Sequence, residues 1–107
     1  MSDRLELHAQ LVEVLGSNNV YFQPPSTVKM NYPCIVYSLD TINTRYANNN
    51  SYLHTKRYQV TVIDKDPDSL IPERILSLPF CNFNRSFTSD NLNHWVFSLY
   101  NKKGVIT

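Results

Sequence analysis

The first apolar pattern of the chain has the spacing of an α-helix. The stripe of Leu5, Ala9, Val12 and Leu15 follows this spacing, and Leu7, Leu11 and Val14 widen it. Ser2 or Asp3 can cap the first turn, and Asp3 with Glu6 has the spacing of a capping box. Gly16 predicts the end of this helix, because glycine readily adopts the left-handed conformation found at helix ends.

The apolar runs that follow are short and rich in β-branched and aromatic residues, which predicts strands. The predicted strands are Val20–Phe22, Tyr32–Leu39, Thr44–Tyr46 and Tyr52–Ile63. Pro24 and Pro25 end the first of them, because proline gives no donor to a strand ladder. The asparagine-rich stretch 47–51 predicts a hairpin tip, since asparagine tolerates positive φ angles. Along the last strand one face is expected to carry Tyr58, Val60 and Val62, and the other Gln59, Thr61 and Ile63.

An acidic stretch, Asp64–Asp68, interrupts the strand pattern and is expected to cap a second helix. Pro72 fits only near the first turn of that helix. Its predicted apolar side consists of Leu70, Ile71, Ile75 and Leu78. Pro79 predicts its end.

Two further strands are predicted near the C-terminus. In the first, Cys81–Thr88, the side chains of Phe83, Arg85 and Phe87 are expected on a common face. A turn at 90–93 leads into the last strand. The apolar face of that strand is expected to consist of Trp95, Phe97 and Leu99.

The order and spacing of these elements predict an α+β fold. We expect a mainly antiparallel sheet of about five to six strands with both helices packed on one face. No linker rich in glycine or proline divides the chain, so residues 1–101 are expected to form a single domain. Residues 102–107 are expected to form a C-terminal tail that is frayed or depends on a partner.

Composition narrows the classes of protein. The chain has 107 residues, of which 42% are apolar and 12% aromatic, and this excludes an intrinsically disordered protein. It has only 2 glycines against an ordinary share of about 7%. Enzymes that bind nucleotides through glycine-rich loops are therefore disfavoured. No apolar run approaches the length of a membrane helix, and the N-terminus lacks the pattern of a signal peptide, so we expect a soluble protein made inside the cell.

Charge is balanced overall, at +1, but it is unevenly distributed along the chain. No acidic residue occurs from Thr41 to Ile63, whereas Asp64, Asp66 and Asp68 follow immediately. One interpretation is an edge hairpin that uses cations to prevent strand aggregation. The other is a basic, aromatic arm that contacts a subunit or partner, as suits head-to-tail association. The candidate interface residues are Arg45, Tyr46, Asn48, Asn49, Asn50, Tyr52, Lys56 and Arg57.

The sequence shows no catalytic, metal or cofactor motif. The aspartates of 64–68 resemble the start of a calcium loop, but Ser69 and Ile75 stand where that loop needs glycine and glutamate. Cys34 and Cys81 are expected to be reduced thiols within apolar segments, and a disulfide between them stays open. A dyad of Cys81 with His94 would require the two side chains to meet. His8 and His54 lie in other elements.

Three segments carry a resemblance to a known family. They are YPCIVYSLD from Tyr32, YLHTKRYQVTVIDKDPDSLIPERILSLP from Tyr52, and FTSDNLNHWVFSLYN from Phe87. These segments resemble the tail-terminator, or tail-to-head joining, proteins of long-tailed bacteriophages. The resemblance extends from the first helix to the last strand. It implies an oligomeric ring, usually sixfold, that caps the tail tube and needs no cofactor.

On this resemblance, the expected function is that of a non-enzymatic virion protein assembled in the host cytoplasm. The implied partners are further copies of the chain, the tail tube protein, a neck or connector protein, and DNA crossing the lumen. One alternative is a head-closure or stopper protein of the neck. Two alternatives from other classes are a small enzyme that uses Cys81 or a histidine, and a nucleic-acid-binding module that uses the basic hairpin.

Overall fold

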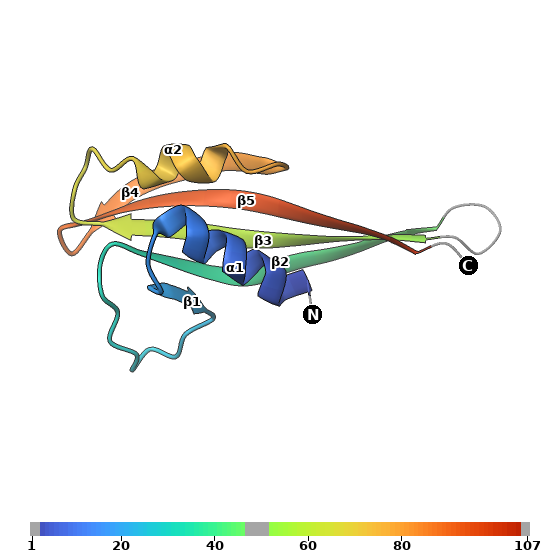
Figure 1. The fold of residues 1–107 in the computed structure, drawn as a ribbon, viewed down its shortest axis with the longest axis horizontal. Helices are drawn as coiled ribbons and strands as arrows, with labels where there is room; N and C mark the ends of the chain where they lie inside the picture. Colours follow the sequence, from blue (N-terminus) through green and yellow to red (C-terminus); the bar gives the residue numbers. More distant parts are fainter. Residues whose placement is uncertain (1–2, 47–51, 106–107) are drawn as a thin grey trace.

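The computed structural model describes residues 3–46 and 52–105 (Figure 1). The helices are α1 (Asp3–Leu15) and α2 (Ile71–Leu76). The strands are β1 (Val20–Phe22), β2 (Cys34–Tyr46), β3 (Tyr52–Asp64), β4 (Cys81–Ser89) and β5 (Leu92–Val105). Among these residues no helix is long and apolar enough to cross a membrane.

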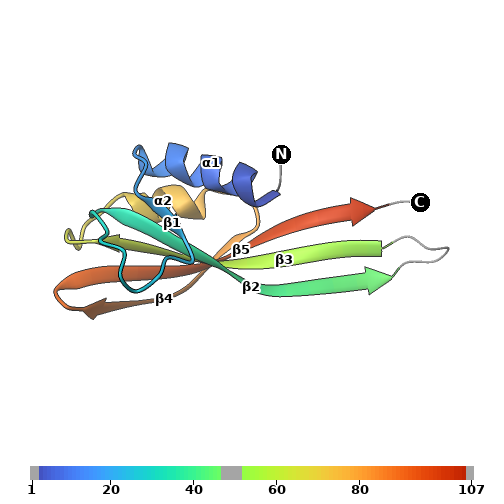
Figure 2. The same ribbon diagram turned by 90° about the horizontal axis from the view of Figure 1, so that it is seen from below.

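The strands form one sheet in the order β1-β2-β3-β5-β4. Three of the four strand pairs are antiparallel, and β1 runs parallel to β2. Both helices lie on the same face of this sheet (Figure 2). The predicted α+β fold with helices on one face is confirmed, and its sheet is mixed rather than purely antiparallel.

The core lies between the helices and the sheet. Its buried side chains are Leu7, Leu11, Leu15, Val20, Ile35, Tyr37, Tyr58, Val60, Val62, Ile71, Ile75, Phe97 and Leu99. Tyr37 is fully buried, and its ring contacts those of His8, Phe22 and Tyr58. The strand residues of this set alternate along β2, β3 and β5, so they share the face that the helices cover.

Helix α1 contacts the sheet through residues four positions apart. Leu7, Leu11 and Leu15 are buried, whereas Leu5 is 44% exposed. The predicted apolar stripe starting at Leu5 is therefore rotated by about one residue from the face that contacts the sheet. The predicted end of the helix is confirmed, because Gly16 has a φ of 83° and its amide donates to the carbonyl of Val12 at 2.9 Å.

Helix α2 is shorter than predicted, and the aspartates do not cap it. Leu70 precedes the helix without any side-chain cap, is 61% exposed, and does not belong to the apolar side. The carboxylate of Asp64 accepts the amide of Asp66, and that of Asp66 accepts the amide of Asp68. These residues form local turns, a known alternative to helix capping for aspartate.

Two predicted strands, Tyr32–Leu39 and Thr44–Tyr46, are parts of the single strand β2. The register between β2 and β3 shifts between Leu39 and Thr41, which leaves Asp40 as an extra residue. Such a bulge interrupts the apolar alternation without ending the strand. The interrupted alternation therefore resembles the end of one strand and the start of another.

Strand β5 continues past the predicted boundary at residue 101 and ends at Val105, paired with Tyr52 of β3. The long strands β2, β3 and β5 project beyond the helices and make the molecule elongated, with extents of 53 × 24 × 23 Å (Figure 2). The radius of gyration of 15.3 Å exceeds the ~13 Å of a compact domain of this size.

Strands β4 and β5 form a hairpin with a tight turn. Asp90 and Asn91 have φ angles of 53° and 62°, as a two-residue type I′ turn requires. The register shifts between Phe83 and Arg85. This bulge places Phe83 beside Phe97 on the helix-covered face, while Phe87 lies beside His94 on the opposite face. The prediction that Phe83 and Phe87 share a face is therefore wrong.

Candidate assembly surfaces

Three strands form a projection that we call the arm. It consists of 41–46 in β2, 52–57 in β3 and 100–105 in β5. The cross-strand register is continuous along the arm, from Arg57 beside Tyr100 to Tyr52 beside Val105. The arm therefore has three hydrogen-bonded strands, one more than the predicted hairpin.

The arm contains the described members of the predicted interface. Arg45 is opposite Leu53, and Tyr46 is opposite Tyr52. Lys56 stands between Ile42 of β2 and Asn101 of β5. The candidates Asn48, Asn49 and Asn50 lie outside the described residues.

Arg57 is bound at the base of the arm. Its Nε donates to Oδ2 of Asp40, the bulge residue, at 2.8 Å. Hydrogen bonds to Tyr100 and then to Asp40 raise the pKa of the Arg57 guanidinium above its ordinary value. Arg57 therefore holds the bulge of β2 against β3, and it is not a free cation of the interface.

Two cations of the arm were missed by the sequence analysis. Lys102 is opposite Thr55, and Lys103 is opposite His54. The predicted frayed tail at 102–107 is therefore wrong for these two residues, because their strand partners in β3 lie far away in the sequence. No acidic residue occurs from residue 92 onward. This pattern, shared with the basic hairpin, was the sequence signal that Lys102 and Lys103 belong to the same basic surface.

Charge is separated along the molecule. The arm contains five of the ten Lys and Arg residues and none of the nine acids. Its cations are Arg45, Lys56, Arg57, Lys102 and Lys103. The loop with Asp64, Asp66 and Asp68 lies at the opposite end, beside the β4–β5 turn (Figure 1). The protein is thus basic at one end and acidic at the other.

Hydrogen bonds between side chains and backbone groups hold the acidic loop. Besides the turns described above, the side-chain amide of Asn93 donates to the carbonyls of Asp64 and Lys65 at 3.2 and 3.3 Å. In the described part of the chain, no group of three His, Cys, Asp or Glu side chains is placed to hold a metal ion. These acids give the loop its charge and its shape.

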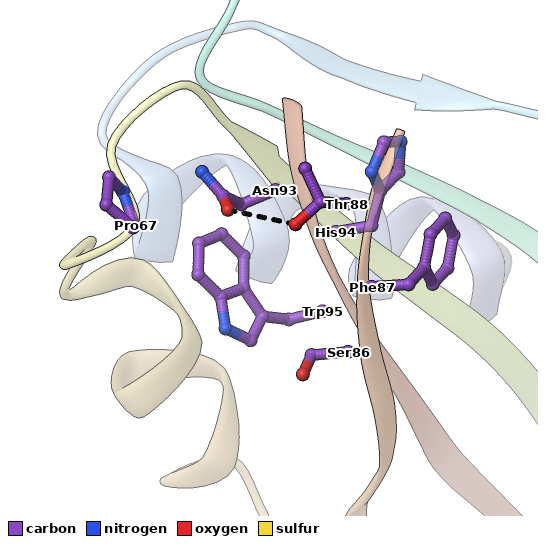
Figure 3. Close-up of a pocket in the computed structure, with 7 residues that line it drawn as sticks. All are labelled: Pro67, Ser86, Phe87, Thr88, Asn93, His94 and Trp95. Atoms are coloured by element: carbon purple, nitrogen blue, oxygen red, sulfur yellow. Dashed lines mark hydrogen bonds between the residues drawn. The ribbon is translucent and has the colours of Figure 1, made fainter. Parts of the chain in front are cut away.

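A shallow hollow of about 350 Å³ lies next to this loop. It is lined by Pro67, Ser86, Phe87, Thr88, Asn93, His94 and Trp95 (Figure 3). The register puts Ser86 and Trp95 on the helix-covered face, whereas Phe87 and His94 stack on the other face at 4.6 Å between ring centroids. Ser86 therefore does not face the imidazole of His94, and the two do not form a nucleophile–base pair.

Cys81 and His94 do not form a reactive pair. Cys81 is opposite Leu99 and His94 is opposite Phe87, so about 17 Å of strand separates them at ~3.4 Å per residue. Both Cys34 and Cys81 are free thiols. Burial, with a smaller contribution from Asp64, raises the pKa of Cys34 to about 11, and burial also raises the pKa of Cys81. Raised thiol pKa values lower the fraction of nucleophilic thiolate.

His8 has a structural role. Its Nδ1 lies 2.8 Å from the hydroxyl of Tyr37, to which Arg4 also donates at 3.4 Å. The Arg4 guanidinium lies 4.6 Å from the centre of the Phe22 ring. These contacts fix the N-terminal half of α1 to β1 and β2.

The outer edge of β4 is the second exposed surface. Eight of the nine residues of β4 are exposed, and β4 is the last strand of the sheet. Phe83 and Phe87 are 47% and 43% exposed, on opposite faces. No other described strand pairs with this edge.

No protein-family model matches the sequence, and none of the curated proteins is significantly similar to it.

Proposed function

We propose that the chain is a structural subunit of a bacteriophage virion, of the tail-terminator or tail-completion type. Copies of the chain form a ring that caps the tail tube and offers a surface to the head. The resemblance of the segments that start at Tyr32, Tyr52 and Phe87 supports this proposal. The function is associative and uses no cofactor.

The separation of charge between the two ends is the observation that carries the proposal. A basic arm and an acidic end on the same chain are complementary surfaces on identical subunits. Such subunits associate head to tail, and a head-to-tail contact produces a ring when its rotation closes. Opposite charges also speed the encounter of the subunits, since electrostatic complementarity raises association rates.

Electron microscopy of a phage that carries an early stop codon in this gene tests the proposal. Overlong or ragged tail tubes beside filled, tailless heads are the expected result. Complementation with the wild-type gene on a plasmid should restore tails of uniform length. Intact, infectious particles in the mutant lysate would overturn the proposal.

The same experiment distinguishes the neck alternative. Emptied heads beside free tails of normal length would assign the chain to head closure as a stopper protein. The cations of the arm other than Arg57 favour one further candidate, a nucleic-acid-binding module. Its signature would be DNA affinity that falls steeply with salt, because phosphate contacts release counterions.

A further inference from the structure

The two edges of the sheet differ in how well they are protected. Strand β1 is only three residues long, and Gln23 with a φ of 42° and then Pro24 and Pro25 follow it. Short edge strands and prolines prevent further strand pairing. Strand β4 is nine residues long and has neither proline nor lysine. Its outer edge is therefore able to accept another strand.

The only charge in β4 is partly masked within its own chain. The Arg85 guanidinium lies 5.6 Å from the centre of the Phe87 ring, on the face opposite the helices. The Phe87 ring also stacks against His94, with an angle of 9° between the ring planes. Phe87 thus contacts two side chains of its own chain and is still 43% exposed.

We propose that two copies of this chain pair through the outer edges of β4. The two strands run antiparallel about a twofold axis at Phe87, and the paired segment is Arg85–Ser89. The two five-stranded sheets then form one continuous sheet. This inference is independent of the proposed function, because it concerns the edge of β4 and not the arm.

The alternation of hydrogen-bonded and non-bonded pairs along the β4–β5 hairpin permits this register. Ser89 and Leu92 close the two-residue turn, and such a closing pair is hydrogen-bonded. Bonded and non-bonded pairs alternate, so Phe87 and Arg85 use their backbone groups toward β5. The backbone groups of Ser86 and Thr88 consequently point outward. A twofold axis at Phe87 brings each Ser86 opposite Thr88 of the second copy, so that the outward groups of both strands meet.

Side-chain chemistry matches the same register. Phe87 meets Phe87 of the second copy at a non-bonded pair, where side chains approach most closely. On the other face, Ser86 meets Thr88, and cross-strand aromatic and hydroxyl pairs are both stabilising. Arg85 faces the uncharged Ser89. A twofold axis at Arg85 would instead place two guanidinium groups directly opposite each other, which is destabilising.

The bulge limits the paired segment on its N-terminal side. The register shift between Phe83 and Arg85 interrupts the regular alternation of β4. Asn84 lies in this shift, and its side-chain amide donates to the hydroxyl of Ser98 at 2.8 Å within its own sheet. The regular part of β4 is therefore 85–89, the segment that the pairing uses.

The mass of the full-length chain in solution, measured by light scattering over a concentration series, tests the pairing. We expect twice the mass of the 12.4 kDa chain at high concentration. Phe87→Lys places like charges on the twofold axis, and we expect it to raise the dimer dissociation constant by at least about tenfold (1.4 kcal/mol). Phe83→Lys is the matched control, because Phe83 has a similar exposure but lies outside the paired segment. A monomer at all concentrations, or equal weakening by both variants, would overturn the proposal.

Disulfide trapping tests the register independently of these substitutions. In a Cys81→Ser background, one protein carries Arg85→Cys and a second carries Ser89→Cys. An equimolar mixture should form mixed 85–89 dimers under mild oxidation, whereas neither protein alone should form a disulfide-linked dimer. Cys34 is fully buried and does not interfere. Absence of the mixed dimer from a chain that is dimeric by mass would overturn the twofold axis at Phe87.

Discussion

The Nδ1 atom of His8 lies 2.8 Å from the hydroxyl of Tyr37, although the two residues are 29 positions apart. The ring of Tyr37 is fully buried, so its polar end requires a partner. His8 and Arg4 supply partners from α1, and this ties the first helix to the second strand. The contact explains why a histidine stands at the edge of the apolar face of α1.

Replacing Tyr37 by Phe keeps the ring and removes this hydroxyl. We expect the free energy of unfolding to fall by about 1 kcal/mol, the usual net value of a hydrogen bond. Urea denaturation of Tyr37→Phe, His8→Ala and the double variant forms the test. Because both single substitutions remove the same interaction, their effects should not add. Strictly additive effects would show that the His8–Tyr37 bond contributes nothing.

The face that α1 turns toward the sheet is testable with two leucines. Leu11 is fully buried and Leu5 is 44% exposed. We expect Leu11→Ala to cost about 2–5 kcal/mol of unfolding free energy, since it leaves a cavity in the core. Leu5→Ala should cost less than about 1 kcal/mol, as is usual for surface positions. Similar urea midpoints for the two variants would contradict the observed orientation of the helix.

The Cys34 thiol predicts a loss of stability in alkali. The unfolded thiol loses its proton near pH 9.0, whereas the folded thiol retains it until its pKa of about 11. Between these values the unfolded state binds fewer protons, so the free energy of unfolding falls as pH rises. Below pH 9 this contribution to stability is fully present.

A comparison of wild type with Cys34→Ala isolates this effect from the other groups that titrate in alkali. The free energy of unfolding, measured at intervals from pH 7 to pH 11, should decline more steeply for the wild type. Parallel curves for the two proteins would mean that Cys34 does not titrate on unfolding in this range.

Charge reversal in the arm tests its part in assembly. Lys102→Glu with Lys103→Glu introduces acids into a surface that has none, and apposed like charges cost several kcal/mol at an interface. We expect this double variant to complement a phage with the stop codon at least about tenfold less well than wild type. Lys29→Glu with Arg74→Glu makes the same change in net charge at exposed positions outside the arm. Equal complementation by the two variants would remove the arm from the assembly interface.

Local signals in the sequence predicted much of the fold correctly. Gly16 marked the end of α1 through its left-handed conformation. The turn predicted at 90–93 is confirmed at Asp90 and Asn91, whereas Leu92 and Asn93 already pair in β5. Alternation along β3 correctly grouped Tyr58 with Val60 on the core face. These features depend on neighbouring residues, which is why the sequence reveals them.

The aspartates of 64–68 formed local turns where a helix cap was predicted, but most other errors concern features that depend on distant residues. The bulge at Asp40 is stabilised by Arg57 on another strand, so the sequence around it looked like the end of β2. The second bulge moved Phe83 and Phe87 to opposite faces, although a regular strand would have kept them together. For the candidate interface, Lys102 and Lys103 were missed because β3, a distant strand, holds their backbone in the sheet.

The strand order has a consequence for how the chain folds. Strands β2 and β3 form one local hairpin, and β4 and β5 form another, but β3 and β5 are joined across a long loop. We call the β3–β5 pairing the seam. Even its pair with the smallest sequence separation, Asp64 with Asn93, is 29 residues apart. Closing such a loop costs entropy before its contacts form.

We therefore expect Asn91→Ala, in the β4–β5 turn, to slow folding, and Phe97→Leu, at the seam, mainly to accelerate unfolding. Stopped-flow kinetics in urea would measure both, and a seam variant that slowed folding as much as the turn variant would contradict this order. The kinetic barrier of this chain then lies in the docking of two preformed hairpins, and β3, the middle strand of the sheet, is completed last along its β5 side.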